Sequence, residues 1–110
     1  MKRIFLILFL HSIAWTSAYD HIKPLPFDPH GWFNNQTALE KIFNTREIHT
    51  VIELGSWAGL STIFFGQAVG PEGKVYAIDT WQGSPTEDVH KNDPRLKNLY
   101  QLFLSNMKHA

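Results

Sequence analysis

Two short segments of this 110-residue chain hold the residues whose types and spacing could bind a nucleoside ligand. The first is the loop Gly55–Gly59 (GSWAG), in which Gly55 allows a sharp turn and Gly59 allows the backbone to approach a ligand closely. The second ends in Asp79, 20 residues after Gly59. An acidic residue at that distance usually accepts hydrogen bonds from a ribose diol. The two segments together predict a site for a ribose-containing ligand.

The loop favours S-adenosylmethionine over a dinucleotide. A dinucleotide loop follows Gly-x-Gly-x-x-Gly, whose middle glycine makes room for a pyrophosphate. Trp57 stands at that position, and the loop contains no lysine or arginine to neutralise phosphate. S-adenosylmethionine has a ribose but no phosphate, and Glu53 could meet its ammonium group directly or through water. Ser61 and Thr62, in the first turn of the next helix, can offer hydroxyls and free amides. An NAD-linked oxidoreductase is the weaker alternative.

Strands and helices at regular spacing are expected to position these residues. β-branched apolar runs predict buried strands over 50–54 and 75–78, and apolar periodicity predicts helices over 35–43 and 60–69. The helix at 60–69 is flanked by the two strands, and the whole unit of about 30 residues has the length of a parallel βαβ unit. Ligands of such sheets bind at the carboxyl ends of the strands, which is where both segments stand.

The flanking regions are expected to cover this unit. Residues 19–31 contain three prolines, which exclude a helix, so this lead-in is predicted to drape over the folded body, pinned by its aromatic residues. Residues 80–92 read as a polar loop. The last helix is predicted to begin at Pro94 with Asp93 as its N-cap. Its apolar stripe, expected to be core, consists of Leu96, Leu99, Tyr100, Phe103, Leu104 and Met107.

In these residues the chain resembles the class I S-adenosylmethionine-dependent methyltransferases. Residues 51–62 (VIELGSWAGLST) and 75–84 (VYAIDTWQGS) are closest to a bacterial subgroup with a Glu-x-Gly-Ser-x-x-Gly-x-Ser-Thr loop and an Asp-Thr-Trp-x-Gly segment. The commoner pattern of the family has a glycine in place of Trp57. The resemblance runs from about Trp32 to the last residue. It implies a Rossmann-like α/β fold, three-layer αβα with parallel strands, of which this chain holds only the first βαβα portion of a seven-stranded domain.

The resemblance also implies roles for individual residues. The loop glycines and Ser56 would line the methionine part of the cofactor, with Glu53 beside them. Asp79 would hold the ribose hydroxyls, and the two residues after it would flank the adenosine. The predicted cofactor-binding residues are Glu53, Gly55, Ser56, Trp57, Gly59, Ser61, Asp79, Thr80 and Trp81. The plainer alternatives are a Glu53 carboxylate that is paired locally and tryptophans that only pack. No catalytic residue can be assigned, because the family places its acceptor-binding residues in later segments.

Composition restricts the partners. Lysine plus arginine equal aspartate plus glutamate at 10 each, so there is no basic surplus for nucleic acid. The chain has no cysteine, and its six histidines include no pair at metal-ligand spacing, so no metal site is predicted. Asp88, His90 and Asp93, close together in one loop, are the weak alternative. The expected partners are a small-molecule methyl acceptor and a second copy or another protein that covers the incomplete sheet.

The first eighteen residues have the features of a signal peptide. Lys2 and Arg3 form a positive start, residues 4–10 are apolar, and small residues occupy 16–18. The apolar stretch is shorter than the roughly 20 residues that a membrane-spanning helix needs, which favours a cleavable leader. An uncleaved anchor is the alternative. The predicted organisation is a leader at 1–18, a proline-rich lead-in at 19–31, and the N-terminal half of a cofactor-binding domain at 32–110.

The leader leaves two functions open. Export to the periplasm or the medium conflicts with a cofactor that is made and used in the cytosol. One hypothesis is therefore a methyltransferase that is cytoplasmic or membrane-anchored, of which this chain carries the cofactor-binding half. The other is an exported, catalytically inactive remnant or interaction protein on the same scaffold.

Overall fold

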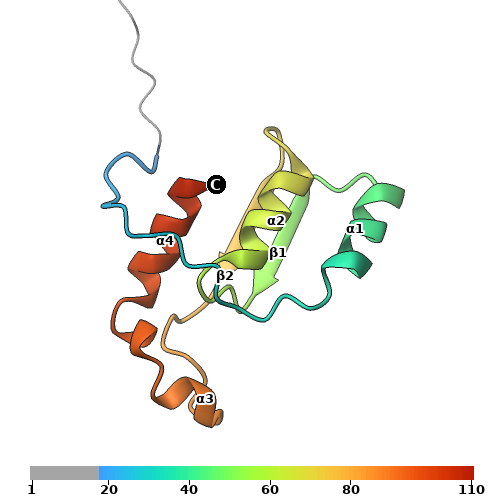
Figure 1. Cartoon of the computed structure of the whole chain (residues 1–110). Helices are drawn as coiled ribbons and strands as arrows, with labels where there is room; N and C mark the ends of the chain where they lie inside the picture. Colours follow the sequence, from blue (N-terminus) through green and yellow to red (C-terminus); the bar gives the residue numbers. More distant parts are fainter. Residues whose placement is uncertain (1–17) are drawn as a thin grey trace, which may run out of the picture.

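The computed structural model describes residues 18–110; residues 1–17, where most of the leader is predicted, lie outside the described part. The elements occur in the order α1 (Gln36–Thr45), β1 (Thr50–Leu54), α2 (Leu60–Val69), β2 (Lys74–Ile78), α3 (Asp88–Lys91), the 3-10 helix η1 (Pro94–Lys97) and α4 (Leu99–His109) (Figure 1). No helix in the described part is long and apolar enough to cross a membrane.

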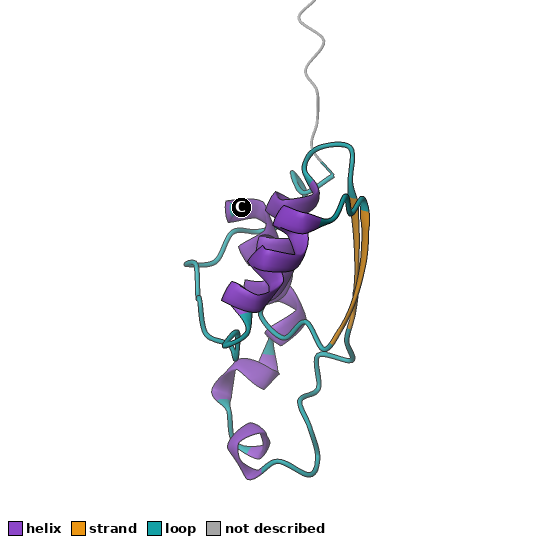
Figure 2. Ribbon diagram, turned by 90° about the vertical axis from the view of Figure 1, so that its right-hand side faces the viewer, coloured by secondary structure: helices purple, strands orange, loops and turns teal. Residues whose placement is uncertain are grey.

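The two strands form a parallel pair joined through α2. Val51 lies opposite Val75, and Leu54 lies opposite Ile78. Beyond the strand the pairing continues, because the backbone N–H of Gly55 donates to the carbonyl of Ile78 at 2.9 Å. The parallel α/β arrangement predicted from the sequence is thus confirmed. In the described part all helices lie on one side of the strands (Figure 2).

The prediction that both strands are buried is wrong for one face of the sheet. Four large side chains on this face are exposed by half or more. They are Ile52 (67%), Leu54 (78%), Tyr76 (52%) and Ile78 (53%). Alternate side chains of a strand point to opposite faces, and the helices cover only the face that holds Val51 and Glu53. We call these four residues the bare face.

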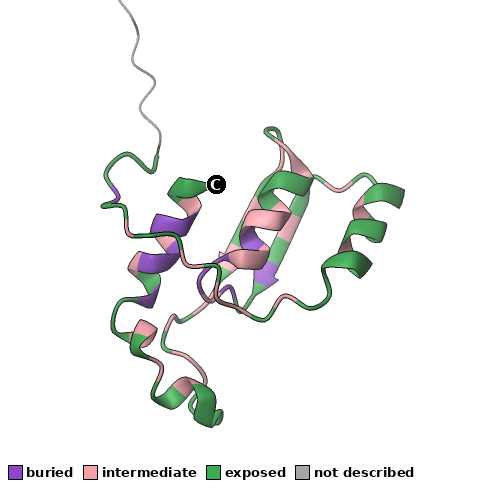
Figure 3. Ribbon diagram, viewed as in Figure 1, coloured by how far each residue is buried: buried purple, intermediate pink, exposed green. Residues whose placement is uncertain are grey.

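The core lies where the loop after β1 meets the start of α4. Ala58, Leu99 and Leu102 are buried together there, and Leu25 and Trp57 pack against them. Figure 3 shows the buried positions gathered on α4 and where the end of β1 runs through its loop into α2.

The last helix is interrupted, although its start was predicted correctly. The Asp93 carboxylate accepts the backbone N–H of Arg95 at 2.9 Å, as an N-cap does, but the turn it caps is the short η1. The regular helix α4 starts only after Asn98, whose backbone is not helical. Tyr100 is exposed, contrary to the expected apolar stripe, and two polar residues, Ser105 and Asn106, are buried instead. The short helix α3 also lies inside the predicted loop.

Residues 22–30, here called the strap, run in extended form along α4. The Ser105 hydroxyl accepts the Leu25 N–H at 2.7 Å and lies 3.2 Å from the Leu25 carbonyl, to which it donates. The Asn106 amide accepts the Asp28 N–H at 3.2 Å and donates to the Asp28 carbonyl at 2.8 Å. The predicted draping is present. Aromatic contacts contribute to it, since the exposed Phe27 ring meets His109 of α4 edge to face and His30 contacts Trp57, but the polar side chains of Ser105 and Asn106 on α4 also hold the strap. An extended backbone has unpaired amides and carbonyls, and these two side chains satisfy them.

Two further contacts fix the strap in place. Arg95 donates from Nε to the Asp28 carboxylate at 2.7 Å, which connects the strap to η1. The Asn106 amide also donates to the carbonyl of Ala58 at 2.8 Å. One buried side chain of α4 therefore holds both the strap and the loop after β1.

Candidate functional site

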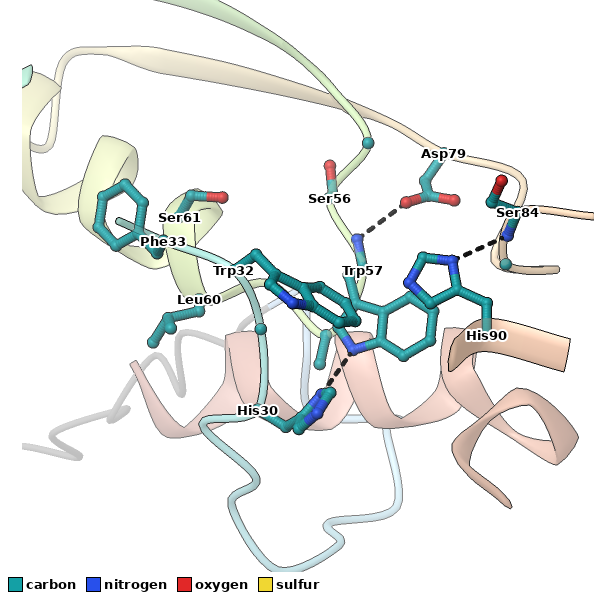
Figure 4. A pocket seen from close by; sticks show the side chains of 14 residues that line it. His30, Trp32, Phe33, Ser56, Trp57, Leu60, Ser61, Asp79, Ser84 and His90 are labelled. Carbon is teal, nitrogen blue, oxygen red and sulfur yellow. Dashed lines mark hydrogen bonds between the residues drawn. The ribbon is translucent and has the colours of Figure 1, made fainter. Parts of the chain in front are cut away.

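A cavity of about 320 Å³ opens at the carboxyl ends of β1 and β2 (Figure 4). Its walls come from residues 30–33, where the strap ends and the chain continues toward α1, from the loop and first helical turn at 55–61, and from residues 79–90 after β2. This is the position at which ligands of parallel sheets bind. The volume lies within the range of about 300–1,000 Å³ that is usual for small-molecule sites.

The structure brings together some of the predicted residues and separates others. The predicted residues that line the cavity are Gly55, Ser56, Trp57, Ser61 and Asp79. The predicted residues outside its lining are Glu53, Gly59, Thr80 and Trp81. Thr80 is exposed. The other three have contacts elsewhere in the fold that account for their positions.

Asp79 joins the two loops that leave the strands. Its carboxylate accepts the backbone N–H of Trp57 at 2.8 Å and that of Trp81 at 2.7 Å. Both tryptophans have positive φ angles, 49° and 52°, which large side chains rarely adopt. An ionised carboxylate offers about four lone-pair positions, so Asp79 can still accept hydrogen bonds from ligand hydroxyls.

The two tryptophans have different surroundings. The Trp57 ring lines the cavity, and its Nε1–H donates to His30 Nδ1 at 3.1 Å. Trp81 instead donates from Nε1 to the Trp57 carbonyl at 3.0 Å and packs against Tyr100 and Phe103 of α4. Trp81 thus fits the alternative of a tryptophan that only packs, whereas Trp57 forms a wall of the cavity.

Glu53 is paired within the fold. Its side chain is buried, 7% exposed, and its carboxylate accepts hydrogen bonds from the hydroxyls of Ser61 and Thr62. These hydroxyls belong to the first turn of α2, where a negative charge is also favoured by the helix dipole. The hydroxyls that were predicted to face a ligand therefore bind the strand, and Glu53 connects β1 to α2.

Gly59 faces α4, not the cavity. Its φ is +90°, and a Cβ atom added to it would lie 2.3 Å from Cε of Met107 and 3.1 Å from Cδ2 of Phe103. The glycine is favoured here both by its positive φ and by the side chains of α4 that lie against it. The close approach predicted at this position exists, but the approaching group is a side chain of the protein.

Several lining residues were not identified from the sequence. His30 ends the strap, Trp32 and Phe33 follow it directly, and Ser84 and His90 come from the segment after β2. Ser84 lies at the end of the second motif but was not assigned a role. No motif marks the other four, because they reach the site through contacts between segments far apart in the sequence, such as the hydrogen bond from Trp57 Nε1 to His30 Nδ1. The weak metal alternative has no support: Asp88 pairs with Lys91 at 2.7 Å, Asp93 pairs with Arg95, and the described residues form no group of three metal-binding side chains.

The lining favours a cationic ligand without phosphate. Asp79 is its one acidic side chain, and it includes no lysine or arginine. The rings of Trp32 and Trp57 lie edge to face with centroids 5.7 Å apart, and aromatic faces attract cations. A pyrophosphate would find no positive charge here, whereas a sulfonium or ammonium group would find a carboxylate and aromatic rings.

Two buried polar atoms indicate that something else completes the site. Among the described side chains, the buried nitrogen and oxygen atoms without a hydrogen-bond partner are Ser56 Oγ and His90 Nε2. Both residues line this cavity. Buried polar groups are nearly always paired, so a ligand or solvent that enters the cavity can supply what the protein does not.

A family model described as a methyltransferase domain matches residues 52–110, more than half of the chain. The match covers most of β1, the loop after it, Asp79 and all of α4. It does not include the strap. No curated protein and no solved structure matches the chain.

Proposed function

The chain belongs to the methyltransferase-domain family, and from this premise we propose that the cavity binds S-adenosylmethionine for transfer of its methyl group to a small-molecule acceptor. The observation that carries the proposal is the charge of the lining. One carboxylate, aromatic rings and no basic side chain suit a cofactor that carries a sulfonium and an ammonium group but no phosphate. The same lining disfavours NAD.

The described residues would bind and orient the cofactor. Asp79 would accept the ribose hydroxyls with the lone pairs that its two backbone partners leave free. Ser56 Oγ, buried and unpaired, would bind a polar atom of the same ligand. Trp57 would cover one side of it. When bound, the cofactor supplies a methyl group on a positively charged sulfur that a nucleophile can displace, and the chain's contribution to that step is alignment.

Calorimetry on the full chain tests the choice of cofactor. S-adenosylhomocysteine, the demethylated product, should bind with one site per chain, and NAD should give no heat of binding. NAD binding that is equal or tighter would contradict the proposal, as would the absence of S-adenosylhomocysteine binding.

The role of Asp79 needs a test that separates ligand binding from loop structure. The carboxylate holds two backbone amides, so Asp79→Ala would disturb the loops whether or not the residue touches the cofactor. The sharper comparison uses Asp79→Asn with two ligands, S-adenosylhomocysteine and an analogue whose ribose lacks both hydroxyls. The wild-type chain should prefer the natural ligand by about tenfold or more, because hydrogen bonds to a charged group are strong. Asp79→Asn should reduce that preference, whereas a loss that is equal for both ligands would mean a structural role alone.

The bare face favours a second candidate, an interaction protein on the same scaffold. Monomeric proteins rarely expose contiguous large apolar patches, and here Ile52 and Leu54 of β1 are exposed next to Tyr76 and Ile78 of β2. Purification from the source cells followed by native mass measurement tests this. A native mass above the 12.7 kDa of the chain, with release of a distinct second polypeptide on denaturation, would support it. A chain that is alone and binds S-adenosylhomocysteine would reject it.

A further inference from the structure

His90 lines the cavity with one ring nitrogen that has no partner. Its side chain is 12% exposed, and Nε2 is buried without a hydrogen bond from the described residues. The histidine lies in α3, outside both segments that indicated the cofactor site. A buried polar atom in the wall of a cavity is more easily explained by a ligand than one that is enclosed in the core.

The contacts of the other ring nitrogen determine what Nε2 can do. The backbone N–H of Ser84 donates to His90 Nδ1 at 3.1 Å, and the Glu87 carboxylate lies 3.7 Å from the same nitrogen, beyond hydrogen-bond distance. Only an unprotonated nitrogen can accept that bond, so the proton of the neutral ring is on Nε2. Nε2–H is therefore a hydrogen-bond donor, and its partner must be an atom with a free lone pair.

The ring is also held in a fixed orientation. It stacks on Trp57, with centroids 4.8 Å apart and an interplanar angle of 20°. The Trp32 ring also contacts the His90 ring, with centroids 4.9 Å apart. Figure 4 shows His90 beside Trp57, near Ser84 and Asp79. A donor whose direction is fixed before binding loses little freedom when the ligand arrives.

We propose that His90 is a cofactor-binding residue whose Nε2–H donates a hydrogen bond to an oxygen atom of the S-adenosyl ligand. This inference rests on the proposed function. The cationic centres of the cofactor do not accept hydrogen bonds, which leaves its oxygen atoms and the adenine ring nitrogens. The oxygen atoms, those of the ribose hydroxyls and of the amino-acid carboxylate, are favoured because His90 and Asp79 line the same cavity. A ribose hydroxyl could donate to Asp79 and accept from His90 at the same time.

Two variants of His90 separate the donor from the ring. His90→Phe keeps an aromatic ring for stacking on Trp57 but has no donor. His90→Gln has an N–H₂ group that can reach the position of Nε2 but has no ring. His90→Phe should weaken the binding of S-adenosylhomocysteine about three- to tenfold, the effect of losing one hydrogen bond. His90→Gln should recover most of the affinity. Melting temperatures of both variants show whether the fold is kept.

A second ligand identifies the oxygen atom. 5′-Methylthioadenosine has the ribose but lacks the amino-acid carboxylate. A penalty of His90→Phe for both ligands, but not for the analogue whose ribose lacks both hydroxyls, would support a ribose hydroxyl. A penalty for S-adenosylhomocysteine alone would support the carboxylate, and an equal penalty for all three ligands would overturn the assignment to an oxygen atom. On the wild-type chain, the ¹⁵N resonance of His90 Nε2 should shift with the same ligands, which gives a readout that does not require a folded variant.

The possible failures can be told apart. If the wild-type chain binds both ligands, and neither the affinity of His90→Phe nor the Nε2 resonance changes, the inference about His90 is overturned and the proposed function stands. If the wild-type chain binds neither ligand, the proposed function is overturned and His90 with it.

Discussion

At the scale of single residues, Glu53 was predicted to bind the ligand but connects β1 to α2. Its two carboxylate oxygens accept the hydroxyls of Ser61 and Thr62, and the side chain is buried. Glu53→Ala should lower the free energy of unfolding by about 1–3 kcal/mol, because it leaves the buried hydroxyl of Thr62 unpaired. Glu53→Gln keeps one carbonyl acceptor and should cost less.

Urea denaturation of the three chains measures these differences. Exposed Glu40 in α1 is the control position, and Glu40→Ala should change stability by less than about 0.5 kcal/mol. An equally small effect of Glu53→Ala would mean that the carboxylate does not connect β1 to α2.

Two glycines near α2 provide a matched pair. Gly59→Ala should destabilise the chain, because its φ of +90° strains any residue with a Cβ and the new methyl group would lie 3.1 Å from Cδ2 of Phe103. Gly66→Ala should stabilise it by about 0.5–1 kcal/mol, because Gly66 is in the helix interior with open space around it. Thermal unfolding of both variants checks the signs. A stable Gly59→Ala chain would mean that α4 does not pack against the loop.

The sequence identified site residues only where the signal was local. Gly55 and Asp79 stand at strand ends, and strand ends can be recognised from apolar runs. The partners of Glu53 and Gly59 depend on which element lies next to them, and the sequence does not state this. His30 and His90 were missed because each reaches the cavity through a segment that has no motif of its own.

At the scale of elements, the strap depends on a salt bridge whose strength varies with pH. Burial alone would raise the pKa of Asp28, but hydrogen bonds from Arg95 and from the His30 N–H, together with the Arg95 charge, outweigh it and lower the pKa below 3.8. The stabilisation is therefore complete above the ordinary pKa and is lost as the pH falls through the lowered value.

Asp28→Asn should reveal this dependence. At neutral pH the variant should unfold at a lower urea concentration than the wild-type chain, and the difference should shrink below about pH 4. Asp88→Asn is the control, since its partner Lys91 forms an exposed pair that contributes little. A difference that stays constant from neutral pH into acid would show that the Asp28 carboxylate does not stabilise the strap.

The longer elements were predictable to within a few residues, whereas the short helix α3 and one break were missed. Helix α2 and strand β1 have the predicted bounds, because apolar periodicity and the glycines after each element define them. The interruption at Asn98 was not predicted, since the residues on both sides of it continue the helical spacing. Ser105 and Asn106 were not recognised as buried because a polar residue in a helix normally indicates solvent.

For the whole molecule, the bare face is the feature with the largest consequence for behaviour in solution. Its four apolar side chains are at least half exposed, so the chain should self-associate as its concentration rises. Ile52→Lys with Tyr76→Lys should keep it monomeric. Light scattering across a concentration series measures this. Thr37→Lys with Ala38→Lys on exposed α1 is the charge-matched control, which should associate like the wild-type chain. A wild-type mass that does not change with concentration would contradict the prediction.

The hydrogen bond between Leu25 and Ser105 joins residues 80 positions apart, and this separation imposes an order on biosynthesis. A ribosome adds about 5–20 residues per second, so Ser105 is made roughly 4–16 s after Leu25. Until then the strap lacks its hydrogen bonds to α4, and residues 30–33 of the cavity wall are held only by contacts such as those with Trp57 and Phe64. The nascent chain can form β1, α2 and β2 before it can close the site. Full competence for the ligand is therefore acquired only after α4 is made, although the wall that α4 fixes in place is made before β1.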